Sequence, residues 1–312
     1  MDFGICLPNF TPGASPEAID AAAEVAARLG WSTAWTTDHV LVPHDAAGEY
    51  GQNYDAIQTL AWVGGRHPDL RLATSVIVVP QRNAIVLAKE LATLDSLTGG
   101  RLIAGVGVGW NRGEFGNLAM DQRFPVRGAY LDETIALWRH LWSGSSEPFH
   151  GRFHTLDDFV FGPLPDQGAS LPIVVGGRVE AALRRAGTVG DGYHSSVTSP
   201  AQYGDRLPTI RAAAAAAGRP MPWLSSRVRV EFDKVTSSGY AMRGSPDAIA
   251  GEVRQFAELG VTHLALWFGT TDAAEIVARA ERFAREVAPL VDQAMPRRGP
   301  GATAAPVPES LQ

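Results

Sequence analysis

Asp38 and His39 are adjacent acidic and imidazole side chains at a position suited to proton transfer. They follow directly on the run from Thr33 to Thr37, which predicts that both lie where a buried strand ends. An imidazole titrates near neutral pH, so His39 could act as an acid or a base, and the Asp38 carboxylate could either set its tautomer or hold loop backbone. We take both as candidate catalytic residues. The alternative is an anchoring aspartate beside a surface histidine.

A glycine-rich turn follows a later apolar run and contains Gly105, Gly107, Gly109 and Trp110. Its spacing differs from the G-x-G-x-x-G fingerprint of dinucleotide-binding folds, and no good helix start follows at once. The turn instead favours a flat aromatic ligand packed against bare backbone. We expect Gly107, Gly109 and Trp110 to border this ligand, with Trp110 either stacking on it or lying in the core.

A second pair of glycines, Gly176 and Gly177, lies between a predicted strand and a predicted helix, and Arg178 follows. Backbone amides at the positive end of a helix can approach an anion, and an arginine adds charge. Ser195 contributes a hydroxyl near the end of the next strand. These four residues predict a phosphate site; the alternative for the glycines is a tight turn without a ligand.

Other motifs argue against several classes of site. The single cysteine, Cys6, is expected in the core and excludes an intramolecular disulfide or a Cys-rich metal site. His150 and His154 lie in a predicted hairpin without further ligands, so we predict no metal site. No G-x-S-x-G, P-loop or H-E-x-x-H sequence supports a hydrolase or a nucleoside-triphosphatase. The residues expected to hold a loop to the body of the fold are Glu114, Arg127, Asp132 and Glu133.

The elements that must position these residues are short apolar runs alternating with alanine-rich helical patterns, which is typical of βαβ units. Ser15-Pro16-Glu17 and Ser245-Pro246-Asp247 each supply an N-cap, a proline and an acid at a helix start. The predicted fold class is α/β, a (β/α)8 TIM barrel with its site at the carboxyl ends of the strands. The predicted strands are 3–7, 33–37, 71–78, 102–106, 173–175, 192–195, 228–232 and 263–267.

The length of 312 residues fits one such barrel with insertions. We predict a single domain over residues 1–295, interrupted by insertions at about 107–126 and 144–171, the second a hairpin. Residues 296–312 are rich in Pro, Ala and Gly and are predicted to form a disordered tail.

Charge and hydropathy limit the possible partners. The net charge of −6 without a basic stripe argues against nucleic acid. No run of 18 apolar residues occurs, and the N-terminus lacks the charged start and apolar region of a signal peptide. We therefore expect a cytoplasmic protein that does not bind membranes and acts on a small, partly apolar molecule.

Seven motifs occur in order along the chain: GICLPN (4–9), TDH (37–39), ATSVIVVPQRN (73–83), AKELATLDSLTGGR (88–101), GVGVGW (105–110), PIVVGGR (172–178) and GDGY (190–193). Over about residues 1–292 the chain thereby resembles the bacterial luciferase-like superfamily of flavin- and deazaflavin-dependent oxidoreductases. The resemblance implies a TIM barrel with insertions. It also implies a non-prolyl cis peptide at Ser75-Val76, which would form a platform behind the flavin or deazaflavin ring.

Within this superfamily, TSV at 74–76 together with GVGVGW resembles the branch that depends on coenzyme F420. The resemblance carries a proton donor or acceptor role onto His39. Other deazaflavin members have a glutamate near the fourth-strand turn, where this chain has Trp110 and Asn111, so the identity of the acid stays open.

The resemblance implies an F420-dependent oxidoreductase that transfers a hydride between the deazaflavin and a small organic substrate. In a second reading, FMN reduced by a separate enzyme supports a monooxygenase. A third reading is a noncatalytic flavin-binding barrel. Family members are commonly dimers, so a homodimer is expected.

Overall fold

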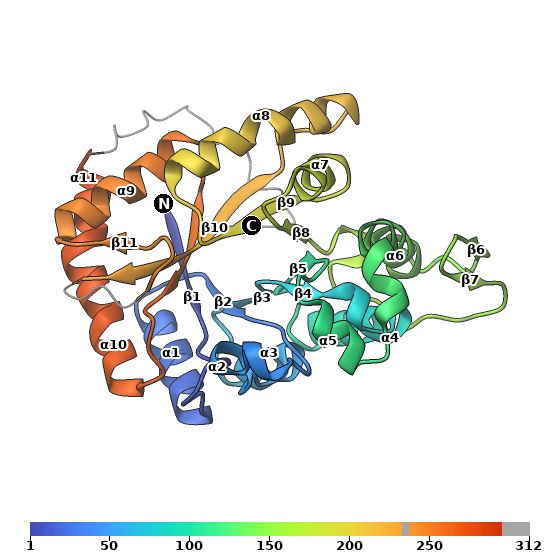
Figure 1. Ribbon diagram of the computed structural model, residues 1–312, viewed down its shortest axis with the longest axis horizontal. Helices are drawn as coiled ribbons and strands as arrows, with labels where there is room; N and C mark the ends of the chain where they lie inside the picture. Colours follow the sequence, from blue (N-terminus) through green and yellow to red (C-terminus); the bar gives the residue numbers. More distant parts are fainter. Residues whose placement is uncertain (233–236, 295–312) are drawn as a thin grey trace.

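The centre of the molecule is a closed barrel of eight parallel strands, seen in a computed structural model that describes residues 1–232 and 237–294 (Figure 1). The last strand of the barrel pairs with the first, which closes the circle. The predicted TIM barrel is confirmed, whereas the tail predicted at 296–312 lies outside the described residues. In order around the barrel the strands are β1 (Asp2–Cys6), β2 (Thr33–Thr36), β3 (Arg71–Thr74), β5 (Leu102–Gly107), β8 (Ile173–Gly176), β9 (Gly192–Ser196), β10 (Trp223–Glu231) and β12 (His263–Trp267).

Helices surround the barrel, and most of those whose first turns are described begin at a residue whose side chain caps them. The Ser15 and Ser245 hydroxyls accept hydrogen bonds from the first turns of α1 and α9, as their Ser-Pro-acid sequences predict. The α-helices are α1 (Pro16–Arg28), α2 (Ala47–Tyr50), α3 (Ala56–Arg66), α4 (Ala84–Leu97), α5 (Arg112–Asn117), α6 (Arg127–Trp142), α7 (Glu180–Thr188), α8 (Pro200–Ala216), α9 (Pro246–Glu258), α10 (Ala273–Arg282) and α11 (Ala288–Ala294). Short 3₁₀ turns are η1 (His44–Ala46), η2 (Val79–Gln81), η3 (Asp121–Val126) and η4 (Gly168–Ser170).

Two strands differ from their predicted bounds by more than one residue. The predicted strand 71–78 is interrupted after Thr74 and resumes as β4 (Ile77–Val78), which pairs with β5. The seventh strand begins at Trp223, five residues before its predicted start, because its first part contains inward-facing polar residues. The Ser225 hydroxyl, for example, lies within hydrogen-bond distance of His194 on the neighbouring strand β9. A pattern search for apolar runs therefore misses the start of β10.

The interior of the barrel is filled by side chains. Strand register places Cys6, Trp35 and Ala73 at one level, and all three belong to a buried cluster that also contains Ile103, Val174, Ala265 and Trp267. A larger apolar cluster packs the outer faces of the strands against the helices. No helix within 1–232 or 237–294 has the length and apolar character needed to cross a bilayer.

The predicted hairpin insertion is present as two antiparallel strands, β6 (Phe149–His150) and β7 (Thr155–Leu156). The Glu133 carboxylate on α6 accepts hydrogen bonds from the N–H groups of Arg152, Phe153 and His154 in the turn. Glu133 thus holds a loop, as expected, and fixes the insertion to the barrel.

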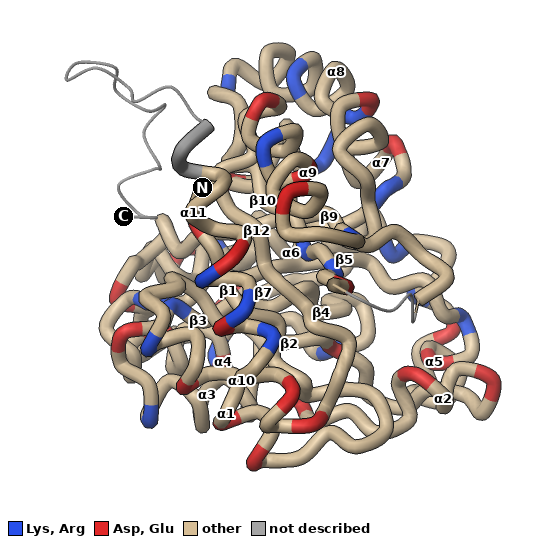
Figure 2. Tube along the Cα trace, turned by 90° about the vertical axis from the view of Figure 1, so that its left-hand side faces the viewer, with Lys and Arg blue, Asp and Glu red and all other residues tan. Residues whose placement is uncertain are grey.

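The C-terminal helix contains a π-helical turn, η5 (Phe283–Val287), between α10 and α11. Phe283 and Val287 are both fully buried, and the Phe283 ring packs edge-on against Phe3 at 5.1 Å. Figure 2 shows acidic and basic residues interspersed along the outer elements.

Candidate functional site

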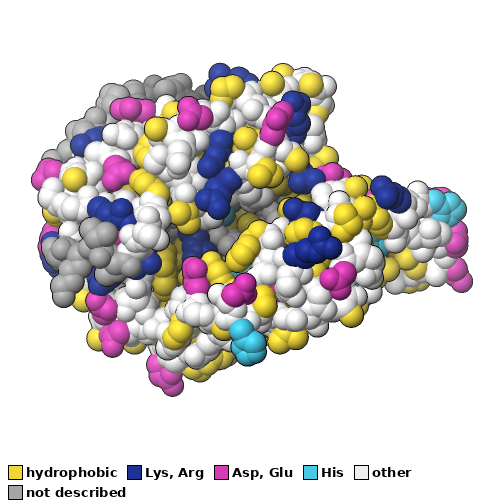
Figure 3. Space-filling view, viewed as in Figure 1, with side chains coloured by type: hydrophobic (Ala, Val, Ile, Leu, Met, Phe, Trp, Pro, Cys, Tyr) yellow, Lys and Arg dark blue, Asp and Glu magenta, His cyan; other side chains and the backbone are white. Residues whose placement is uncertain are grey.

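The carboxyl ends of the barrel strands open at the face bordered by α2 and α5, which we call the barrel mouth. Figure 3 shows this face hollowed at its centre, with Lys and Arg side chains around the hollow. His39, Ser75, Gly107 and Gly176 end or follow four neighbouring strands that lead to this face. Barrel closure therefore gathers most of the predicted site.

His39 is buried at the mouth and is paired with a glutamate. Its Nδ1 lies 3.0 Å from Oε2 of Glu114, whose Oε1 accepts a 2.7 Å hydrogen bond from the Val40 N–H. An ionised carboxylate only accepts, so Nδ1 carries the proton and Nε2 is left to exchange one with a ligand. Among the described residues, Nε2 has no hydrogen-bond partner. This arrangement gives His39 a defined tautomer for acid-base work.

Glu114 is the carboxylate that lies against His39, a contact that the sequence did not assign. It lies on α5, which Asn111 caps through hydrogen bonds to the N–H groups of Gly113 and Glu114. Burial opposes ionisation, but hydrogen bonds from His39 and Val40 outweigh it and hold the pKa of Glu114 below its usual value. Glu114 was expected only to hold a loop; it does so and also orients the imidazole.

Asp38 does not set the tautomer of His39, which corrects one of its two predicted roles. One carboxylate oxygen accepts the Val78 N–H at 2.9 Å and the other accepts from Arg82 at 2.6 Å. Burial works against the charge of Arg82, but the Asp38 carboxylate outweighs it and raises the pKa of that guanidinium. Asp38 thus holds backbone next to β4, and its predicted catalytic role has no support from these contacts.

Ser75 and Val76 form a bulge between β3 and β4, and the peptide bond between them is cis, as the resemblance implied. The Val76 side chain lies between β5 and β8, and each of these strands has a glycine where it faces Val76. A β-carbon added at Gly107 would lie 2.5 Å from Val76 Cγ2, and one added at Gly176 would lie 2.8 Å from Cγ1. These two glycines make room for Val76, which corrects the idea that both simply expose backbone to a ligand.

A buried chain of hydrogen-bonded polar side chains, which the sequence did not single out, lies beneath the bulge. His194 on β9 places Nε2 2.9 Å from the Ser75 hydroxyl and Nδ1 2.7 Å from the Ser225 hydroxyl. The ring stacks on Trp35 with centroids 4.2 Å apart. Burial, with the nearby charge of Arg227 acting in the same direction, keeps the pKa of His194 well below its usual value. A neutral imidazole therefore fixes the Ser75 hydroxyl from below.

Acid is expected to destabilise the fold as the pH falls below about 6.5, because burial also lowers the pKa of His263 to about 4. Both buried histidines, His194 and His263, stay neutral in the folded protein while the unfolded chain takes up protons. The stability that these neutral histidines contribute is complete above pH 6.5 and is lost as the pH falls toward 4. For His263 the loss is on the order of 3 kcal/mol.

Urea unfolding at several pH values checks this dependence. His263→Phe should flatten the curve between pH 6.5 and 4, since neither ring nitrogen of His263 has a recorded hydrogen-bond partner among the described residues. His150→Gln, at an exposed histidine, should leave the curve unchanged. An unaltered slope in the His263 variant would show that this group does not govern acid stability.

The residues of the predicted phosphate site differ in exposure: two of them are exposed, whereas Ser195 is buried. Gly177 and Arg178 are exposed after β8, and no hydrogen bond or ion pair within the described residues engages Arg178. Ser195 is fully buried, and its hydroxyl lies 2.8 Å from that of Ser226. The Ser195 side chain is therefore turned away from solvent, and its position does not support contact with a ligand. A phosphate role for Gly176, Gly177 and Arg178 stays a prediction.

Trp110 is 64% exposed, so the alternative that it is a core aromatic is wrong. Its ring lies at the mouth, 6.3 Å from the His39 ring and 6.4 Å from that of Tyr50. The statement that no helix start follows the glycine turn is also wrong, because α5 begins at Arg112. A β-carbon added at the adjacent Gly109 would lie 2.6 Å from Val78 Cγ1 and 3.1 Å from Phe115 Cε2. The role of Gly109 as a border of the ligand stays a prediction.

The other residues expected to hold loops, and the two histidines of the hairpin, make contacts that stabilise the fold. Arg127 donates to the Phe124 carbonyl, and Asp132 pairs with Arg185 on α7. His150 binds Asp157 and His154 binds Glu133. In the described part of the chain no group of three or more potential ligands could hold a metal ion.

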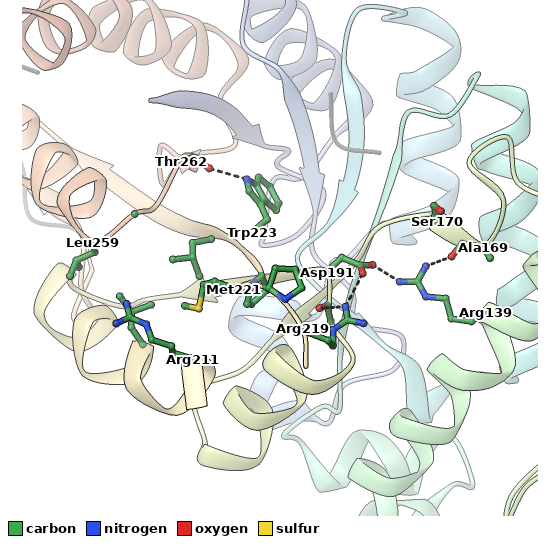
Figure 4. Close-up of a pocket in the computed structure, with 16 residues that line it drawn as sticks. Arg139, Ala169, Ser170, Asp191, Arg211, Arg219, Met221, Trp223, Leu259 and Thr262 are labelled. Carbon is green, nitrogen blue, oxygen red and sulfur yellow. Dashed lines mark hydrogen bonds and ion pairs between the residues drawn. The ribbon is translucent and has the colours of Figure 1, made fainter. Parts of the chain in front are cut away.

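A cavity of about 860 Å³ lies at the opposite, N-terminal end of the barrel (Figure 4). The Asp191 carboxylate at its edge pairs with Arg139 from one side and with Arg219 from the other. Asp191 also accepts the N–H of Ile173 at the start of β8. These contacts tie loops together at an end of the barrel where TIM-barrel enzymes do not place their chemistry.

Comparison with known proteins identifies relatives and solved structures that are similar to this chain. The F420-dependent glucose-6-phosphate dehydrogenase of Mycolicibacterium fortuitum is 33% identical over 213 residues, which make up 66% of this chain and 61% of that protein. A solved F420-dependent secondary alcohol dehydrogenase, in complex with an F420-acetone adduct, has a TM-score of 0.78 at 19% identity. The match covers 93% of this chain and 98% of the other.

A third similar protein binds FMN. The oxygenating constituent of 3,6-diketocamphane monooxygenase from the CAM plasmid of Pseudomonas putida, solved with FMN, has a TM-score of 0.78 at 15% identity. The match covers 96% of this chain and all of the other. At such identities the solved structures show a shared fold. The sequence model of the luciferase-like monooxygenase family matches residues 1–295, and the chain therefore belongs to that family.

Proposed function

We propose that this chain is an F420-dependent oxidoreductase that transfers a hydride between the deazaflavin and a small organic substrate. The observation that carries the proposal is the pairing, at one barrel mouth, of the Val76 platform with the His39–Glu114 pair. The name of the 33% identical relative supports F420 as the cofactor. When bound, a deazaflavin supplies a carbon centre that accepts or donates hydride.

The residues present fit a flat ring with a phosphate-bearing tail. Val76 is fixed from behind by Gly107 and Gly176, so its outer surface can support one face of a ring. Arg178, which is exposed and unpaired within the described residues, would bind the phosphate together with the amides of the β8–α7 turn. Trp110 would cover the edge of the ring.

The proton in this reaction would pass through His39. With the deazaflavin as hydride acceptor, Nε2 of His39 would take the hydroxyl proton of a carbinol substrate, which would become a carbonyl. In the reverse direction Nε2 returns the proton to the oxygen. The ionised Glu114 carboxylate stabilises the imidazolium that forms between these events, because it lies against Nδ1.

Parallel titration of the apoprotein with F420 and with FMN, followed by fluorescence, tests the proposal. We expect F420 to bind more tightly and to be reduced or oxidised when a substrate is added. Tight binding of reduced FMN with oxygen consumption, and no response to F420, would replace the proposal with a two-component monooxygenase that needs a separate reducing enzyme. Failure of both to bind would favour a noncatalytic barrel. The homodimer expected from the resemblance remains a prediction.

A further inference from the structure

Arg227 reaches across the inside of the barrel mouth. It lies on β10, where Trp223 and Ser225 face the barrel interior, so strand alternation directs Arg227 inward as well. Its Nη1 donates a 2.9 Å hydrogen bond to the Thr37 hydroxyl beyond the end of β2. The guanidinium lies over the Phe10 ring, 4.8 Å from the ring centroid. Arg227 is therefore held in one place and is only partly exposed.

The charge of Arg227 has no carboxylate partner within the described residues, unlike that of its neighbours. Arg82 pairs with Asp38, and both Arg229 and Arg243 pair with the same carboxylate, that of Glu231. A partly buried guanidinium that has only a hydroxyl and an aromatic face is incompletely compensated. Its field, together with that of Arg178, counteracts the effect of burial on the pKa of the nearby Tyr50. An anionic group placed beside Arg227 would complete its coordination.

The position of Arg227 points to the substrate as the source of that anion. The Val76 platform lies among β4, β5 and β8, and the cofactor phosphate is proposed at the β8–α7 turn. Arg227 instead reaches from β10 toward Thr37 after β2 and Phe10 after β1. Its anchor, Thr37, is two residues from His39. A group bound by Arg227 would thus lie on the side from which the proton is exchanged.

Aromatic rings connect Arg227 to His39. The Phe10 ring beneath the guanidinium stacks at 6.2 Å on Tyr50 and lies 5.0 Å from Trp267. The Tyr50 ring in turn lies 4.1 Å from the His39 ring. Phe10 and Trp267 are buried, whereas Tyr50 is partly exposed and can offer its ring to a flat apolar body with a charged end at Arg227 and an oxygen-bearing carbon at His39.

We propose that the substrate is a carboxylic acid with a flat apolar body, and that Arg227 binds its carboxylate while His39 exchanges the proton at its reacting oxygen. This inference rests on the proposed function, since it places the substrate beside a bound F420. It selects acids over neutral molecules of the same shape. The guanidinium matches a carboxylate in geometry as well as in charge.

Benzoate and benzamide test the proposal, because they have the same shape and differ in charge. Calorimetric titration of the F420-loaded protein should show benzoate binding about 10- to 100-fold more tightly than benzamide. Arg227→Gln should reduce this preference to near unity, and Arg227→Lys should restore part of it. Arg178→Gln is the matched control: it should weaken F420 binding but keep the wild-type preference for benzoate.

If the wild-type protein binds benzoate and benzamide equally well, that result alone overturns the proposal, and no variant is needed. A loss of F420 affinity in Arg227→Gln, with the benzoate preference kept, would also overturn it by assigning the arginine to the cofactor. The same two titrations on protein without cofactor separate this inference from the proposed function. If F420 does not bind but benzoate is still preferred through Arg227, the proposed function fails and the acid site stands.

Discussion

Replacing His39 with alanine is expected to lower kcat with F420 by about 10²- to 10⁴-fold, the range that a general acid or base contributes. The imidazole is the group at the mouth whose Nδ1 is fixed by a carboxylate and whose Nε2 faces no recorded partner within the described residues. Cofactor affinity should change little, because the Val76 platform is built from other strands. Stopped-flow measurement of F420 reduction, together with an F420 titration, separates the two quantities.

Glu114→Gln tests whether His39 acts through its glutamate. The amide keeps the size of the side chain but loses the charge that stabilises an imidazolium, so kcat should fall and its pH profile should shift to lower pH. His44→Ala, at a histidine on the neighbouring η1 turn, is the control and should leave both unchanged. Full activity in His39→Ala would remove this residue from the proton-transfer step.

Gly107→Ala is expected to weaken F420 binding about tenfold or more and to destabilise the fold by about 1–3 kcal/mol, the usual cost of overpacking. The new methyl group would lie 2.5 Å from Val76 Cγ2, so Val76 or the β5 backbone must shift. A displaced Val76 no longer offers the same surface to the ring. Fluorescence titration and thermal unfolding measure the two effects.

The double variant Gly107→Ala/Val76→Ala separates the clash from other causes. Removal of the Val76 methyl groups should restore the melting temperature, while F420 binding should stay weak because the platform is gone. Gly65→Ala on α3 is the control, since a β-carbon there meets nothing within 4 Å. That helical substitution should be neutral or stabilising by about 1 kcal/mol. Failure of the double variant to regain stability would show that Val76 is not the residue displaced.

The barrel could be predicted from sequence because its strands are mostly apolar runs and several of its helices, such as α1 and α9, have capped starts. His39 and the Gly107 turn were found because each follows such a run. The partner of His39 was not assigned, because the contact with Glu114 depends on where α5 places a residue 75 positions away. Asp38 was assigned a catalytic role for the same reason: adjacency in sequence does not show which way a carboxylate turns.

His194 was missed because it stands inside a buried strand, where neither an apolar pattern nor a motif distinguishes a polar side chain facing the interior. Ser195, its neighbour, was chosen for its hydroxyl, but strand alternation points it to Ser226. The start of β10 was missed because Ser225 and Arg227 serve the interior and the mouth instead of the apolar core. In each case a polar side chain that faces the interior or the mouth breaks the apolar run by which a strand is predicted.

Because of the π-helical turn from Phe283 to Val287, the packing of the C-terminal helix depends on the number of residues in that turn. A π turn contains one more residue than the α-helical turn it replaces, so deletion of a single residue there should convert the segment to continuous α-helix. The residues that follow would then rotate by about 100° relative to the barrel. Val291, which is now fully buried, would turn out of the core, so a change far from the mouth would unseat the last helix while leaving every side chain of the site intact.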